Sequence, residues 1–131
     1  MTNQANIQLD ANHTKMVGAY IRAMQWATTD TDTDQYLEQF ELSEEARQAA
    51  VIACARFIAV HGNDMEVVRG MLLDYGYEQA GHDLFLTREG HGAGFWDRDL
   101  GHYGDVFTKY CEGIGGCDPY VGDDQLIYMG E

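Results

Sequence analysis

The chain has 131 residues, of which 45% are hydrophobic, enough to build one core in a single domain. It carries 22 acidic and 8 basic residues, giving a formal net charge of −14 that is divided evenly between residues 1–80 and 81–131. A surface of this sign repels nucleic acid and anionic membranes but attracts basic proteins, although the same acidity also serves solubility or adaptation to high salt.

The polar residues 1–13 predict a flexible lead-in to a single domain over 14–131. Within that domain, residues 14–80 are expected to be helical, because apolar residues recur at every third or fourth position. The first helix should run from an N-cap at Thr14 to about Ala27.

The connector that follows this helix reads D-T-D-T-D-Q-Y-L-E-Q-F-E. Its carboxylates occupy the first, third, fifth and twelfth positions of an EF-hand calcium loop, as Asp30, Asp32, Asp34 and Glu41. The sixth position is normally a glycine, because the loop turns sharply there, and here it is Gln35. We therefore favour an acidic connector without metal and keep calcium as the alternative.

Two further helices are expected before residue 80. Ser43 is followed by two glutamates, a pattern typical of an N-cap, and Gly62 suits the end of that helix. Asn63 and Glu66 form a capping-box pattern, which predicts a separate third helix that continues through Asp74.

Residues 81–131 differ in character, since ten of the fifteen glycines lie from Gly90 onward. Leu84–Arg88 is predicted to be a strand, because it is a short apolar run next to a turn signal. The glycine-rich segment E-G-H-G-A-G would form the turn, and Phe95–Arg98 would be the returning strand of a hairpin.

A short helix over residues 104–113 and a closing hairpin are predicted next. Pro119–Val121 and Leu126–Tyr128 would be the strands of that hairpin, with G-D-D-Q between them. The predicted fold class is therefore α+β: N-terminal helices packed on a small C-terminal antiparallel sheet of two hairpins with an intervening helix.

Two segments carry a resemblance to known proteins. Ala80–Gly101 reads A-G-H-D-L-F-L-T-R-E-G-H-G-A-G-F-W-D-R-D-L-G, and Tyr120–Tyr128 reads Y-V-G-D-D-Q-L-I-Y. Together with A-M-Q-W-A-T-T-D, they resemble a family of small acidic, uncharacterised proteins of bacteriophages and related mobile elements. The resemblance covers about residues 18–128 and implies a phage or plasmid origin, but no reaction. Gln125 departs from the family pattern, which usually has glycine at that position.

The predicted first hairpin gathers polar side chains that could form a site. Its candidate residues are Arg88, His91, Arg98 and His102, because histidines near aspartates can bind a metal or act as a general base. No H-E-x-x-H, C-x-x-C or nucleophile-elbow pattern supports catalysis. The ion pairs and glycines of a tight turn would explain the same residues structurally, and Trp96 is expected in the core.

The three cysteines do not form a disulfide framework, since their number is odd and their spacing irregular. Zinc binding by Cys111, Cys117 and His102 is disfavoured, because five residues rich in glycine separate the two cysteines. The N-terminus lacks the basic start and apolar run of a secretion signal. We therefore expect a protein of the bacterial host's reducing cytoplasm, without a cofactor.

Size, charge and the resemblance together predict a non-enzymatic accessory protein that binds and inhibits a host protein with a basic surface. That partner could be a nucleic-acid-handling or defence protein, and DNA mimicry is one way to occupy its groove. The alternatives are a metal-dependent small enzyme or a small-molecule-binding module that uses the polar hairpin. The carboxylates expected to carry binding are Asp30, Asp32, Asp34, Asp97, Asp99, Asp123 and Asp124.

Overall fold

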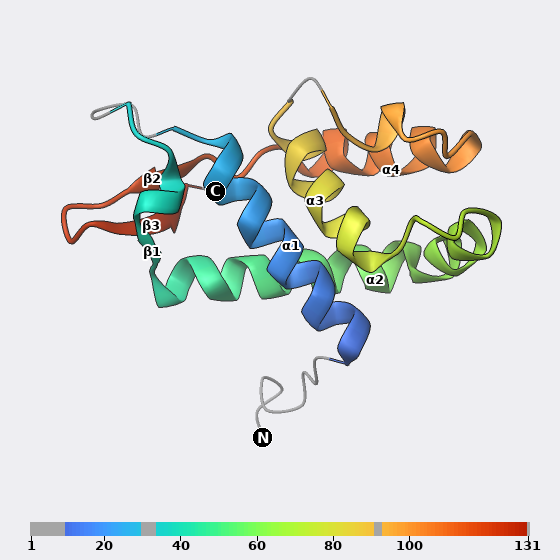
Figure 1. Ribbon diagram of the computed structural model, residues 1–131, viewed down its shortest axis with the longest axis horizontal. Helices are drawn as coiled ribbons and strands as arrows, with labels where there is room; N and C mark the ends of the chain where they lie inside the picture. Colours follow the sequence, from blue (N-terminus) through green and yellow to red (C-terminus); the bar gives the residue numbers. More distant parts are fainter. Residues whose placement is uncertain (1–9, 30–33, 91–92, 131) are drawn as a thin grey trace.

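The computed structural model describes residues 10–29, 34–90 and 93–130 and has the predicted α+β class (Figure 1). The α-helices are α1 (Ala11–Ala27), α2 (Glu44–Met71), α3 (Tyr77–Arg88) and α4 (His102–Ile114). Two short 3₁₀ helices, written η2 (Leu37–Gln39) and η3 (Phe95–Asp97), lie between α1 and α2 and between α3 and α4. The strands are β1 (Glu41–Leu42), which precedes α2, and β2 (Pro119–Val121) and β3 (Leu126–Met129), which follow α4. The long helix α2 runs along the molecule, with the β2–β3 hairpin at one end and α4 towards the other.

Helix α1 begins earlier than the sequence pattern predicts. The carboxylate of Asp10 accepts a hydrogen bond from the backbone N–H of His13 at 2.8 Å and caps the helix, so Thr14 is not the N-cap. The buried ring of His13 then lies 3.1 Å from the carbonyl oxygen of Val51 on α2. The predicted lead-in is therefore too long, because aspartate caps a helix as well as threonine does.

The predicted second and third helices are one helix, α2. Ser43 caps it as expected, but the helix continues through residues 63–71 with a kink at His61, where φ is −121° and ψ is 17°. The imidazole of His61 packs edge-on against the rings of Phe107 and Tyr110, at centroid distances of 5.5 and 5.2 Å. These contacts hold the half-buried kink against α4, and the helix continues where Gly62 suggested an end.

The prediction of a strand at Leu84–Arg88 is wrong, since these residues form the last turns of α3. Leu84, Phe85 and Leu86 are all buried, although consecutive helical residues point in different directions. Because α1, η3 and α4 all pack on α3, its apolar residues lack a one-sided helical spacing, and a buried helix then resembles a buried strand in sequence.

The returning strand of the first predicted hairpin is also absent, because Phe95–Asp97 form the 3₁₀ helix η3. Phe95 is buried in the core, where its ring stacks on Phe57 at 5.6 Å between centroids. Trp96, expected in the core, is 53% exposed. A single turn of 3₁₀ helix points adjacent side chains in different directions, so the two aromatic residues have different environments.

The closing hairpin is confirmed and belongs to a three-stranded mixed sheet with β3 in the middle. Strand β1 pairs in parallel with β3, placing Glu41 opposite Leu126. In the β2–β3 turn, Gln125 has φ of 67° and its backbone N–H bonds the carbonyl oxygen of Gly122 at 2.9 Å. This left-handed conformation favours glycine, so the glutamine side chain at position 125 introduces strain.

Candidate functional site

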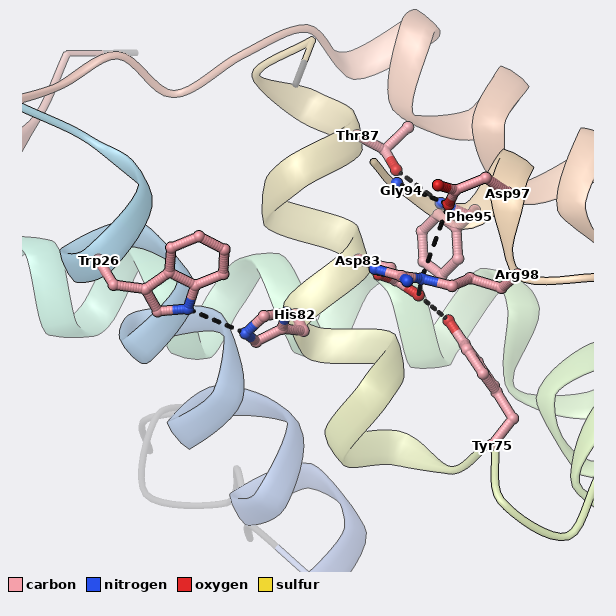
Figure 2. A network of polar contacts seen from close by, with 9 residues as sticks. All are labelled: Trp26, Tyr75, His82, Asp83, Thr87, Gly94, Phe95, Asp97 and Arg98. Carbon is pink, nitrogen blue, oxygen red and sulfur yellow. Dashed lines mark hydrogen bonds and ion pairs between the residues drawn. The ribbon is translucent and has the colours of Figure 1, made fainter. Parts of the chain in front are cut away.

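The central polar group of the molecule is the carboxylate of Asp83 on α3, which is 1% exposed (Figure 2). It accepts a hydrogen bond from the Tyr75 hydroxyl at 2.6 Å and bonds from Nε and Nη2 of Arg98 at 3.0 and 2.9 Å. The hydrogen bond to Asp83 raises the pKa of Arg98, and burial together with Asp83 raises the pKa of Tyr75. The network ties the segment after η3 to α3.

A pocket of about 440 Å³ lies beside this network, within the range that small ligands occupy. Two ion pairs line it: Arg98 with Asp83, and Arg22 of α1 with Glu78 of α3 at 3.1 Å. The lining residues are Ala19, Arg22, Tyr75, Glu78, Gln79, His82, Asp83 and Arg98. The pocket wall therefore contains two positive and two negative groups, which balance each other.

One wall of the pocket is the imidazole of His82. The indole Nε1–H of Trp26 points at His82 Nε2 from 3.1 Å, and the two rings lie 5.3 Å apart (Figure 2). Burial lowers the pKa of His82, although Asp83 opposes the shift, and the charges of Arg98 and Arg22 lower it further. The lowered pKa of His82 favours its neutral form, and in that form the bond from Trp26 makes Nε2 the acceptor and leaves the proton on Nδ1.

Two other polar side chains of this region, Thr87 and Asp97, bond the backbone at Gly94 and Phe95, and the bond from Thr87 ties that backbone to α3. The Thr87 hydroxyl accepts a hydrogen bond from the Phe95 N–H at 3.0 Å, and the Asp97 carboxylate accepts one from the Gly94 N–H at 3.1 Å (Figure 2). A Cβ atom on Gly94 would overlap the Thr87 side chain, so glycine is required for this close approach. Both polar side chains serve the local backbone.

Arg88 faces a different part of the molecule. Its Nε donates to the carbonyl oxygen of Gly115 at 2.7 Å, and its Nη1 donates to the Tyr20 hydroxyl at 2.9 Å. His102 is exposed at the start of α4, and His91 lies outside the described residues. Arg98 instead binds Asp83, so Arg88 and Arg98, both described residues of the predicted set, have different partners.

Four of the predicted acidic residues lie in two separate parts of the structure. Asp97 and Asp99 are exposed on either side of Arg98, whereas Asp123 and Asp124 are exposed in the β2–β3 turn at the other end of the molecule (Figure 1). These carboxylates therefore do not form one continuous surface.

The calcium prediction falls partly outside the described residues, which exclude Asp30 and Asp32. Asp34 is exposed with φ of 61°, and Glu41 lies on β1. An EF-hand places its twelfth residue where the second helix starts, but α2 begins only at Glu44. The part of the loop that is described therefore does not have the EF-hand arrangement.

Within residues 10–29, 34–90 and 93–130, no three histidine, cysteine or acidic side chains gather as a metal site requires. Cys54, Cys111 and Cys117 are free thiols in the interior, and burial raises the pKa of each to about 12. These three thiols are protonated at neutral pH.

A second polar cluster lies on the sheet, and we call it the hairpin surface: Glu41, Tyr120, Asp123, Asp124 and Tyr128. The two tyrosines are cross-strand partners whose rings stack at 5.8 Å, and Glu41 is opposite Leu126 on the same face. The Tyr128 hydroxyl donates to Asp124 at 2.6 Å, which lowers the pKa of Asp124 and raises the pKa of Tyr128 to about 12. The tyrosine pair was missed in the sequence, although the register of the predicted hairpin would have revealed it.

Sequence reasoning also missed the pairing of Asp83 with Tyr75 and Arg98, since no local pattern links a turn, a helix and a loop.

No described helix is long and apolar enough to cross a membrane. Comparisons of the chain with protein-family models, with curated proteins and with solved structures found no match.

Proposed function

We propose that this protein is a non-enzymatic binding protein of a phage or mobile element that occupies a basic surface on a host protein. The observation that carries this proposal is the hairpin surface, where exposed carboxylates surround a stacked tyrosine pair. Tyrosine is enriched at the energetic centres of protein interfaces, and carboxylates around it would steer and select a basic partner. Nucleic-acid-handling and defence proteins of the host present such surfaces.

The hydrogen bonds of Asp83, Thr87 and Asp97 support a role without catalysis. Asp83 accepts bonds from Tyr75 and Arg98 on both carboxylate oxygens, so its lone pairs are not available to a substrate. Thr87 and Asp97 bond the backbone of the neighbouring loop. A general base must reach the proton that it removes, and these groups are already engaged within the fold.

Affinity capture from a bacterial lysate tests the proposal. The wild type should retain a basic protein at low salt and release it in high salt, because screening weakens exposed charge pairs. A variant with Glu41→Gln, Asp123→Asn and Asp124→Asn should lose that protein. Each substitution preserves side-chain shape. The new amide oxygen at position 124 can accept the bond from the Leu126 N–H, while the amide nitrogen donates to the Tyr128 hydroxyl.

A matched variant with Asp74→Asn, Asp105→Asn and Glu112→Gln serves as the control, because it removes the same charge from exposed residues elsewhere. It should capture the partner as the wild type does. Equal capture by the hairpin-surface variant, or capture that does not respond to salt, would contradict the proposal.

A further inference from the structure

Arg98 presents a free donor edge to the pocket beside Asp83. Its side-on pairing with Asp83 uses Nε and Nη2. The ion pair of Arg98 with Asp97 is longer, with 3.7 Å between Nε and Oδ1. Among the described residues, no group bonds Nη1, and the side chain is 36% exposed. The edge formed by Nη1 and Nη2 matches the two oxygens of a carboxylate, and Asp83 holds the guanidinium in a fixed orientation.

The same pocket presents an acceptor in Glu78. Its carboxylate side chain is 59% exposed, and its partner is the equally exposed Arg22, through one oxygen at 3.1 Å. The other carboxylate of the pocket, Asp83, has both oxygens occupied by Tyr75 and Arg98. Glu78 is therefore the group that can accept a hydrogen bond from a ligand ammonium.

His82 adds a second donor near Arg98. Its Nε2 faces Trp26, so its proton is on Nδ1, for which the described residues provide no partner. Glu78 and His82 lie one turn apart on α3, as do Gln79 and Asp83, so these side chains share one helix face. The pocket thus combines a guanidinium group that Asp83 holds in place, on Arg98, with the exposed carboxylate of Glu78.

We propose that this pocket binds a small zwitterion, a free amino acid, with its carboxylate on Arg98 and its ammonium group on Glu78. The balance of charge favours this class. The net charge of −14 repels an anionic ligand from the whole molecule, and the pocket wall itself carries two positive and two negative groups. A ligand with one charge of each sign is not repelled by the net charge, and it can pair with both Arg98 and Glu78.

Nuclear magnetic resonance titration of ¹⁵N-labelled protein tests the proposal. The twenty common L-amino acids are added one at a time at millimolar concentration, while the Nε–H of Arg98 and the indole N–H of Trp26 are observed. At least one amino acid should shift both signals. For that amino acid, the amine that lacks the carboxylate and the acid that lacks the ammonium group should each bind at least about tenfold more weakly.

The substitution Glu78→Gln should weaken binding of that amino acid about tenfold, because an amide lacks the charge that pairs with ammonium. Glu45→Gln, at an exposed glutamate on α2, is the matched control and should leave binding unchanged. Absence of a shift with all twenty amino acids, equal binding of either analogue, or unchanged binding by Glu78→Gln would overturn the proposal. The hairpin surface contributes no residue to this pocket, so the outcome is independent of the host-protein proposal.

Discussion

Asp83 shows how one residue joins parts of the chain that the sequence does not connect. Its carboxylate receives bonds from Tyr75, which precedes α3, and from Arg98, which follows η3. A buried carboxylate is costly unless donors satisfy it, and here three donor atoms do so. The polar residues of this region were visible in the sequence, but their partners were not, because hydrogen-bond geometry depends on the packing of several elements.

The substitution Asp83→Asn should lower the free energy of unfolding by roughly 2–3 kcal/mol, because one amide group would oppose the donors of Tyr75 or Arg98. Urea unfolding followed by circular dichroism would measure it. Asp97→Asn is the control, since its exposed carboxylate accepts one bond from Gly94. The free energy of unfolding of the Asp97→Asn variant should fall by less than about 1 kcal/mol. Equal stability of Asp83→Asn and the wild type would argue against a structural role for this network.

At the scale of elements, helix α3 is where local pattern and final structure disagree most. The run Leu84–Leu86 is buried on several sides, and burial on several sides removes the periodicity that distinguishes a helix from a strand. Close approach of α1 is possible because Gly81 has no side chain, and a Cβ atom there would overlap the carbonyl oxygen of Met16. The neighbouring helix therefore explains a glycine that lowers helix propensity.

Gly81→Ala should destabilise the protein by at least about 2 kcal/mol, although alanine is the better helix former, because the clash is with backbone that cannot rotate away. Gly70→Ala, in α2, is the matched control, since nothing lies within 4 Å of the added methyl group. It should be neutral or stabilising by up to about 1 kcal/mol. Thermal unfolding of both variants would check the difference, and a stabilised Gly81→Ala would contradict the close packing.

At the scale of the whole molecule, three free thiols from distant parts of the chain are buried in the core. Cys54 lies on α2, Cys111 on α4 and Cys117 just before β2. The positive charge of Arg88 acts to lower the pKa of all three thiols. The Tyr20 hydroxyl donates to the sulfur of Cys117 at 3.6 Å. Desolvation is the largest influence on each thiol and raises its pKa from 9.0 to about 12.

Stability should therefore fall between pH 9 and about 12. The unfolded chain loses its thiol protons in this range and the folded chain keeps them, so stability is complete below pH 9 and decreases above it. Each thiol contributes a slope of up to about 1.4 kcal/mol per pH unit. Urea unfolding at several alkaline pH values would measure it, and Cys54→Ala should have a shallower slope. An unchanged slope in that variant would show that the thiol at Cys54 is not the cause.

The sequence alone determined the features that depend on neighbouring residues: the cap at Ser43, the helix near residues 104–113, the closing hairpin and the acidic composition. Caps, turns and charge act over a few residues, so they can be read locally. Only the tertiary structure decided that Leu84–Arg88 is helical, that α2 passes through its kink and that β1 joins β3. It also decided the pocket around Arg98 and Glu78, because burial and side-chain pairing arise when distant segments pack together.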